Sequence, residues 1–372
     1  MANTSVNMHN LVSAKDAIKI METMARSRIN GNATNATLWR GKPGIGKSSI
    51  VRQVAESLGI GCVEIHLAQL DRVDICGLPS VDGGTTKWNV PQFWPRDPQS
   101  KGVIFFDEIT SATPDVQVAA YSIILDRAIP NTDYKLPDGW SIIAAGNLAT
   151  DRAVVKSMSS ALANRFMHFE LEASAEDWGI WALMNNIHPA VTGYINYRPD
   201  NLHKMDNQNL EQGWPSPRSW EGVSKAIADF GADEYLLQKA VYGLVGPGVG
   251  VEFMAFYKIA SQFDDVLNML TNPEAEIVIP SEADRRYALC SSAAYLIWNN
   301  PDEDEIKKRV KGFYRIVNKL SPDFATALGK MCMTGNKSIS KIKAMTYIMS
   351  APEYKEYSKK YSAAFEQAPV KL

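Results

Sequence analysis

A glycine-rich segment in the first part of the chain has the composition and spacing of a phosphate-binding loop. It reads Gly-Lys-Pro-Gly-Ile-Gly-Lys-Ser from Gly41 to Ser48 and matches the pattern G-x-x-x-x-G-K-[ST]. A β-favouring run precedes it and an amphipathic helix pattern follows, so backbone N–H groups and a helix N-terminus can converge on phosphate oxygens. In this arrangement Lys47 reaches the β- and γ-phosphates and Ser48 ligates Mg²⁺. The nucleotide-binding residues expected here are Gly41, Pro43, Gly44, Ile45, Gly46, Lys47, Ser48 and Ser49.

Two carboxylates end a strongly apolar run further along the chain. Residues 103–106 read Val-Ile-Phe-Phe and lead directly into Asp107 and Glu108. Carboxylates at the end of a buried strand cost free energy unless they are used. Asp107 can hold the magnesium ion through water, which places it with Ser48 among the metal ligands and among the nucleotide-binding residues. Glu108 can polarise the attacking water as a general base.

Three further polar residues stand where they could reach a nucleotide phosphate. Asn147 follows the buried run 141–145 and can orient the lytic water or contact the γ-phosphate, unless it only forms a turn. Arg165 comes just before the last β-favouring run and can reach an adjacent subunit, unless it is a surface arginine without a role. Arg218 opens a predicted helix, where the helix dipole disfavours a cation, so the position favours an anionic partner. The catalytic residues predicted are Lys47, Glu108, Asn147, Arg165 and Arg218.

The elements around these residues predict an α/β fold. Five β-favouring runs alternate with helix-length or loop-length stretches, which fits five parallel strands in a wound sheet. After about residue 177 the strand pattern fades and helical periodicity dominates. The five runs lie at residues 37–39, 63–67, 103–106, 141–145 and 166–171.

Segments rich in Gly and Pro suggest a division into three regions. We expect an α/β nucleotide-binding domain over residues 1–212, a helical lid over 213–300 and a basic helical region over 301–372. The first domain would carry an insert at about 72–95 and a hairpin at about 126–140. The insert contains Trp88, Phe93 and Trp94, which can either contact a client or pack against the core.

The composition is that of a globular protein able to bury two or three packed units. The chain has 372 residues, of which 45% are hydrophobic and 22% charged, and this excludes a disordered tail protein. We find no pattern of a transmembrane span, secretory signal, disulfide framework or zinc motif, so we expect a cytoplasmic protein whose four cysteines are buried thiols. The net charge of −2 argues against a chain that coats nucleic acid, although residues 313–372 carry ten basic and four acidic residues, or +6.

The order of these motifs resembles that of the AAA+ ATPases, and most closely their MoxR and dynein-related branch. Residues 71–79 read Asp-Arg-Val-Asp-Ile-Cys-Gly-Leu-Pro and are similar to the stretch D-x-x-D-[LI]-x-G that begins the helix-2 insert of that branch. Residues 117–137 are similar to its helix and hairpin before sensor 1. In the terms of this family, the phosphate loop is Walker A, residues 103–108 are Walker B, Asn147 is sensor 1, Arg165 is the arginine finger and Arg218 is sensor 2.

The resemblance implies an αβα sandwich of five parallel strands with a helical lid, and ATP and Mg²⁺ as ligands. It further implies a homo-hexameric ring in which Arg165 of one subunit completes the site of its neighbour. Relatives often work with a partner that carries a von Willebrand factor A domain and remodel or mature a protein complex. We therefore expect such a partner and a protein client whose identity the sequence does not disclose, and no membrane.

Two other functions remain open. A DNA-directed AAA+ ATPase, such as a loader or helicase-like enzyme, would use the basic end of the chain, where Tyr354, Tyr357 and Tyr361 alternate with lysines and could stack on bases. The same tyrosines could instead dock their helix onto its own domain, with the lysines reaching solvent. A P-loop small-molecule kinase would need an acceptor pocket but would need neither Arg165 nor Arg218.

Overall fold

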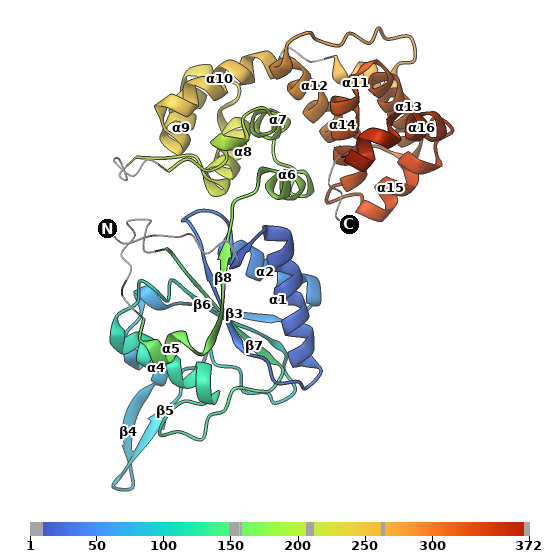
Figure 1. The fold of residues 1–372 in the computed structure, drawn as a ribbon. Coiled ribbons are helices and arrows are strands. Elements are labelled where there is room, and N and C mark those ends of the chain that lie inside the picture. The colour runs from blue at the N-terminus through green and yellow to red at the C-terminus, as the bar shows by residue number, and fades with distance from the viewer. Residues whose placement is uncertain (1–9, 149–155, 157, 206–211, 262–264, 368–372) are drawn as a thin grey trace. The chain divides into compact units, whose positions relative to one another are not determined.

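The computed structural model describes residues 10–148, 156, 158–205, 212–261 and 265–367. Its contacts divide the chain into two compact units, Met1–Ala173 and Ser174–Leu372. The first unit is built on a β-sheet, and the described residues of the second form helices and their connections (Figure 1).

A six-stranded parallel sheet forms the centre of the first unit. All five predicted strands are present, and they lie across the sheet in the order fifth, first, fourth, third, second. The α/β fold is therefore confirmed, with one additional edge strand that was not predicted because its two residues are too few to show periodicity. Across the sheet the strands are β1 (Leu11–Val12), β8 (Phe166–Leu171), β2 (Ala36–Arg40), β7 (Trp140–Gly146), β6 (Gly102–Asp107) and β3 (Gly61–His66).

Strand β6 shows how the sheet buries side chains on both faces. Val103 and Phe105 belong to the apolar core on one face, and Ile104 and Phe106 belong to the core on the other. Because helices cover both faces, the central strands are continuous apolar runs, and polar side chains appear where the strands end. Figure 1 shows helices on either side of the sheet. They are α1 (Ala14–Ile29) and α2 (Lys47–Leu58) on the first face, and α3 (Arg72–Cys76), α4 (Pro114–Asp126) and α5 (Ser160–Ala163) on the second.

The thiols are buried as expected except for one. Cys76, Cys290 and Cys332 are buried, whereas Cys62 is exposed. Cys62 lies on β3, one of the two edge strands, which has a neighbouring strand on one side only. The prediction was therefore wrong for this one cysteine, because a sequence pattern does not tell which strand will be at the edge.

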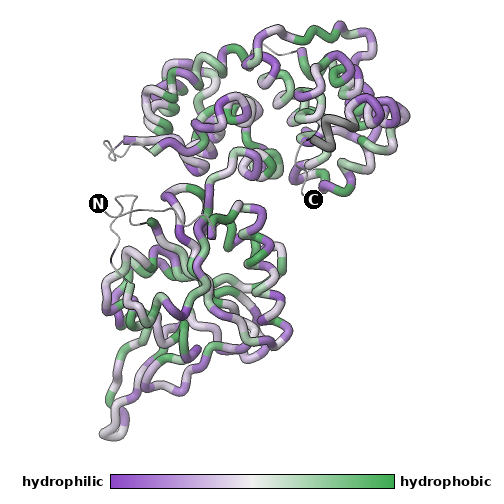
Figure 2. Tube along the Cα trace, in the orientation of Figure 1, coloured by the Kyte–Doolittle hydropathy of each residue, from purple (hydrophilic) through white to green (hydrophobic). Residues whose placement is uncertain are grey.

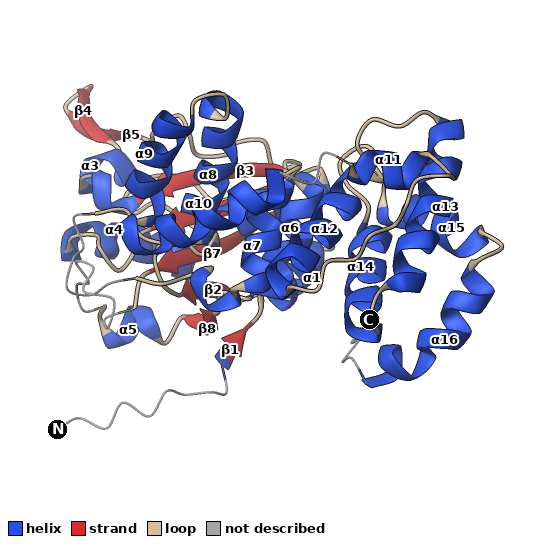
Figure 3. Cartoon of the chain, turned by 90° about the horizontal axis from the view of Figure 1, so that it is seen from above, coloured by secondary structure: helices blue, strands red, loops and turns tan. Residues whose placement is uncertain are grey.

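The predicted insert contains an antiparallel pair of strands, β4 (Leu78–Asp82) and β5 (Thr85–Asn89), which projects from the rest of the first unit (Figure 3). Behind this pair, Trp94 is fully buried and its Nε1 donates a hydrogen bond to the backbone oxygen of Ile75 at 3.0 Å. Phe93 is exposed. Of the two alternatives for Trp94, the structure therefore supports packing in the core.

The described residues of the second unit form helices and their connections, and hydrophilic and hydrophobic residues are interspersed along them in Figure 2. Among the described helices, none combines the length and the apolar character needed to cross a membrane. The helices are α6 (Ala175–Met184), α7 (Pro189–Tyr197), α8 (Pro217–Phe230), α9 (Glu234–Val245), α10 (Pro247–Ser261), α11 (Val266–Thr271), α12 (Ala283–Leu296), α13 (Glu303–Lys319), α14 (Pro322–Thr334), α15 (Lys341–Ser350) and α16 (Tyr354–Gln367).

The boundary between the two units differs from the one placed at residue 212. Helices α6 and α7 precede that residue, but α7 packs against α8, α10 and α12, and α6 packs against α14. A single apolar core then joins residues on both sides of residue 300, including Leu289, Trp298 and Val317. Gly and Pro mark the ends of helices in the sequence, but they do not indicate which helices share a core.

The tyrosines of α16 pack inside the second unit. Tyr357 and Tyr361 are each 1% exposed, and their hydroxyl groups donate to the backbone oxygens of Ala325 and Val317 at 3.2 and 3.1 Å. Buried rings of this kind are not available to stack on bases. The structure therefore supports the docking alternative for these two residues.

His188 caps α7 and gives the second unit a predictable pH dependence. Its Nδ1 accepts a hydrogen bond from the N–H of Ala190, its own N–H donates to Ser224 Oγ, and burial lowers the pKa of the imidazole to about 4. Since the unfolded chain binds this proton at a pH near 6.5, the unfolded state takes up more protons as the pH falls from 6.5 towards 4. The neutral cap thus contributes stability above pH 6.5 that is lost in this window.

We expect the free energy of unfolding to fall by about 2 kcal/mol between pH 7.5 and pH 5 on account of His188. Urea unfolding at the two pH values measures this fall. In a His188→Asn variant the cap is kept by a side chain that does not titrate, so the fall should be smaller by about that amount. An equal fall in both proteins would contradict the assignment.

Candidate nucleotide-binding site

The phosphate loop joins the carboxyl end of β2 to the first turn of α2. Gly44 and Gly46 have φ values of 75° and 99°, a left-handed conformation that side chains other than glycine rarely adopt. Gly46 is the N-cap of α2, so the loop turns directly into the helix. Ile45 is buried in the same apolar core as Val51, so its side chain holds the loop against this core. This geometry leaves the N–H groups at the start of α2 facing the space where an anion would bind.

Hydrogen bonds from Lys47 link the phosphate loop to the residue that follows a second strand. Its Nζ donates to the backbone oxygens of Gly41 and Lys42 at 2.6 and 3.1 Å, and to Oδ1 of Asn147 at 3.2 Å. Asn147 directly follows β7, the neighbour of β2 in the sheet. The lysine and the asparagine are separated by a hundred residues in the sequence, and the structure brings them into contact.

Ser48 and Asp107 form a pair of oxygen ligands. Ser48 Oγ donates to Oδ2 of Asp107 at 2.6 Å, and the backbone N–H of Glu108 donates to Oδ1 at 2.9 Å. Asp107 is 9% exposed, so its carboxylate is held away from bulk water by these contacts. A hydroxyl and a carboxylate oxygen are hard donors of the kind that Mg²⁺ takes in nucleotide sites.

Glu108 lies in a turn with an unusual backbone conformation. Its φ is 57°, which is uncommon for a residue with a side chain and is found mainly where the surrounding structure enforces it. Two hydrogen bonds hold the turn: Ile109 N–H donates to Ala145 O at 3.0 Å and Ser111 N–H donates to Glu108 O at 2.8 Å. The carboxylate of Glu108 is half-buried beside Asp107, at the carboxyl end of the sheet.

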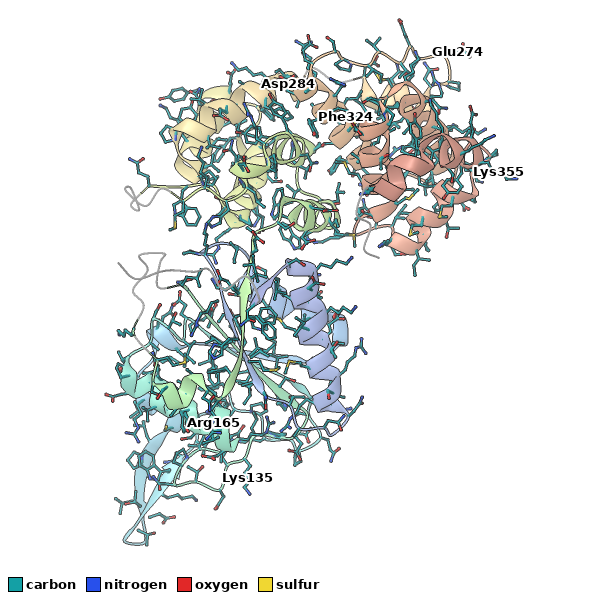
Figure 4. The ribbon with its side chains drawn as sticks, viewed as in Figure 1. Lys135, Arg165, Glu274, Asp284, Phe324 and Lys355 are labelled. Atoms are coloured by element: carbon teal, nitrogen blue, oxygen red, sulfur yellow. The ribbon has the colours of Figure 1, made fainter. Side chains whose placement is uncertain are left out.

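Arg165 lies at the opposite end of the sheet from the phosphate loop. It directly precedes β8, whose first residue pairs with Ala36, the first residue of β2, whereas the loop follows the last residue of β2, Arg40. Five residues of extended strand span about 17 Å. Arg165 is exposed, and Figure 4 shows it at the end of the first unit where β8 starts. The phosphate loop of its own chain is therefore out of its reach.

Arg218 lies in the second unit and is not among the residues that the first unit brings together. It occupies an exposed position in the first turn of α8, directly after Pro217. Ser216 and Ser219 cap that helix reciprocally: Ser219 N–H donates to Ser216 Oγ at 3.1 Å and Ser216 N–H donates to Ser219 Oγ at 2.7 Å. The guanidinium takes no part in this cap, so the helix start does not depend on it.

Of the other residues expected in the loop, Gly41 supplies the carbonyl that receives Lys47, and Pro43 is partly exposed at the loop surface. Ser49 is exposed on α2. Sequence reasoning did not single out His66, which ends β3 level with Asp107 and has Nδ1 3.9 Å from its Oδ2. The strand register could have identified His66, because β3 and β6 are adjacent in the sheet and their carboxyl ends lie side by side.

Glu64, His66 and Asp107 have ligand atoms within 4.8 Å of one another and could in principle hold a metal ion. Arg52, however, donates to both carboxylate oxygens of Glu64 at 2.8 and 2.9 Å. Because the guanidinium already compensates the charge of Glu64, this carboxylate is a poor candidate for a metal ligand.

A separate cavity of about 770 Å³ lies beside the inserted strands. Thr85 to Trp88 of β5 line it on one side, and the segment 131–135 lines it on the other. Tyr134 of this segment donates from its hydroxyl to the backbone oxygen of Pro95 at 2.9 Å. The insert and the hairpin before β7 are thus tied to each other at the cavity.

Comparisons with known proteins find a family match for the segment that carries this site. Residues 37–166, which run from β2 to the start of β8, match the family described as AAA domain (dynein-related subfamily). Midasin of Giardia intestinalis is 27% identical over 203 residues, which cover 52% of this chain and 4% of midasin. The chain therefore spans a small fraction of the length of this curated relative.

Among solved structures, the chain is similar to the RuvB Holliday junction branch migration motor of Thermotoga maritima, with 16% identity, a TM-score of 0.33, and coverage of 94% of this chain and 94% of that one. It is also similar to the closed state of Hsp104 with ATPγS and FITC casein, with 17% identity, a TM-score of 0.35, and coverage of 66% and 46%. TM-scores of this size do not bear on the function of the chain.

Proposed function

From the match of residues 37–166 to the dynein-related subfamily of AAA domains, we propose that the chain is a MoxR-type AAA+ ATPase. In this proposal it hydrolyses Mg·ATP in a homo-hexameric ring and uses the energy to remodel or mature a protein complex. The observation that carries the proposal is the convergence of Lys47, Ser48, Asp107 and Asn147 at the carboxyl ends of neighbouring strands. A turn of unusual conformation presents Glu108 at the same edge.

The geometry supports a specific division of roles. ATP phosphates would lie on the N–H groups of the phosphate loop, with Lys47 donating to the β- and γ-phosphates. Ser48 and Asp107 would hold Mg²⁺, which supplies neutralisation of phosphate charge when bound. Glu108 accepts a proton from the water that attacks the γ-phosphorus, the bond from that phosphorus to the bridging oxygen breaks, and ADP leaves. Asn147 orients the water or the γ-phosphate.

Assembly into a ring is proposed because Arg165 is exposed and about 17 Å along the strands from the phosphate loop of its own chain. A second copy placed with that surface against the site would supply the guanidinium there, where it offsets charge developing on the γ-phosphate. Arg218 would act on the same charge from the lid.

We expect Arg165→Ala to bind ATP with normal affinity and to hydrolyse it slowly, by a factor of about 10³. Mixing it with Lys47→Ala protein should restore part of the turnover, because one variant brings an intact phosphate loop and the other an intact Arg165. Phosphate release measured over a series of mixing ratios tests this. Arg26→Ala, at an exposed arginine of α1 in the same unit, serves as the control and should keep full activity alone. Absence of rescue at every ratio would contradict action between subunits.

A remodelling role is proposed for the two tied segments at the 770 Å³ cavity. Because the hydroxyl of Tyr134 donates a hydrogen bond to Pro95, a displacement of either segment on hydrolysis would be passed to the other. We propose a protein client, a partner with a von Willebrand factor A domain and a cytoplasmic location, because relatives in this branch often work with such a partner on a protein complex. The DNA-directed alternative has less support, since Tyr357 and Tyr361 are buried and are not available to stack on bases.

A further inference from the structure

Thr110 joins the two strand ends that carry the chemistry. It lies three residues after Asp107, is 3% exposed, and its Oγ1 accepts a hydrogen bond from the backbone N–H of Asn147 at 3.1 Å. Its own backbone oxygen accepts the N–H of Lys156 at 2.7 Å. This buried threonine lies in the segment after β6 and thus contacts two residues that follow β7.

The close approach at this point depends on Gly146. A Cβ atom on Gly146 would lie 2.5 Å from Cγ2 and 2.6 Å from Oγ1 of Thr110, closer than atoms can pack. The glycine therefore leaves the space in which the threonine hydroxyl meets the chain directly before Asn147. With the bond from Ile109 N–H to Ala145 O, this contact fixes the turn of Glu108 relative to the end of β7 at two successive residues.

We propose that Thr110 is a positioning residue for ATP hydrolysis, holding the side chain of Asn147 at a fixed place relative to Glu108. The inference rests on the proposed ATPase function and adds to it a residue that acts through Asn147. Asn147 reaches Lys47 through its Oδ1 at 3.2 Å, so a shift of its backbone moves its amide relative to both the lysine and the general base. A misplacement of about 1 Å in such a constellation costs about a hundredfold in rate.

The chemical requirement is for a hydroxyl and not for the shape of the side chain. Thr110→Val keeps the volume and the branching but leaves the N–H of Asn147 without its acceptor in a buried setting. We expect the kcat of ATP hydrolysis to fall about tenfold or more, while the dissociation constant of a fluorescent ATP analogue changes by less than about twofold, because the phosphate loop is untouched. Thr110→Ser keeps the acceptor and should retain most of the wild-type kcat.

Thr37 provides a matched control. It is 2% exposed, lies on β2 in the same unit, and its Oγ1 accepts the Nε1–H of Trp39 at 3.0 Å. Thr37→Val therefore removes a buried hydroxyl with a hydrogen-bonded partner but leaves the strand ends intact. We expect its kcat to match that of the wild type, so an equal fall in kcat for Thr37→Val and Thr110→Val would reduce Thr110 to a stabilising residue.

A double-mutant cycle separates positioning from general damage. If Thr110 acts through Asn147, Thr110→Val should cost little further in an Asn147→Ala protein, so the two losses do not add. Additive losses, or a Thr110→Ser protein as slow as Thr110→Val, would overturn the proposal. Should the valine variant not fold, Thr110→Ala removes the same hydroxyl acceptor without adding bulk and takes its place in the cycle. If the wild type releases no phosphate from ATP, the proposed function fails; if it does and Thr110→Val matches it, only the present inference fails.

Discussion

A Glu108→Gln protein is expected to bind ATP as tightly as the wild type and to hydrolyse it about 10²–10⁴ times more slowly. The amide fills the same volume as the carboxylate but cannot take a proton from water. Its backbone turn should persist, because main-chain hydrogen bonds from Ile109 and Ser111 hold it. Asp107 keeps its contact with Ser48, so the expected magnesium ligands also remain.

Two measurements on this variant separate binding from chemistry. Titration with a fluorescent ATP analogue gives the affinity, and phosphate release under excess ATP gives the rate. Glu56→Gln makes the same chemical change at an exposed position of α2 in the same unit and should behave as wild type in both. A Glu108→Gln enzyme that remains active would exclude Glu108 as the general base.

Lys47→Ala is expected to weaken ATP binding about a hundredfold or more. The ammonium lies within 3.2 Å of two loop carbonyls and Asn147, so it is already directed at the place where the β- and γ-phosphates would lie. Each charge-assisted hydrogen bond lost to a phosphate costs about 1.5–3 kcal/mol. Loss of binding, rather than loss of rate alone, distinguishes this variant from Glu108→Gln.

Lys42 offers a control within the same loop. Its side chain is exposed, and only its backbone oxygen receives Lys47, so Lys42→Ala should keep near-wild-type affinity. Equilibrium binding of the fluorescent analogue to both variants tests the difference. If Lys42→Ala and Lys47→Ala weakened binding equally, the loop would act through its net charge and not through a directed contact.

The sheet and the core of the site could be predicted from the sequence because burial produces a clear pattern. Strands such as β6 are covered on both faces, so they read as unbroken apolar runs, and a polar residue at their end stands out. The phosphate loop is similarly recognisable, since its left-handed positions select glycine. These local rules place Lys47, Asp107 and Glu108 without any knowledge of the tertiary structure.

Other features depend on which elements become neighbours, and the sequence does not record that directly. The hydroxyl of Thr110 matters only because β6 and β7 lie side by side, and Gly146 makes room for it. The sequence allows Tyr357 either to stack on bases or to pack in its own domain, and contacts with a helix distant in sequence bury it. The start of the second unit at Ser174 likewise follows from the packing of α6 and α7.

The mass of the Glu108→Gln protein in solution, with and without Mg·ATP, tests the central claim most directly. Light scattering after gel filtration should show small species without nucleotide and a shift to about six subunits when Mg·ATP is added, because an uncleaved γ-phosphate keeps Arg165 of each neighbour engaged. A monomer under both conditions would contradict an intersubunit site and would make the P-loop kinase the better account of the same residues.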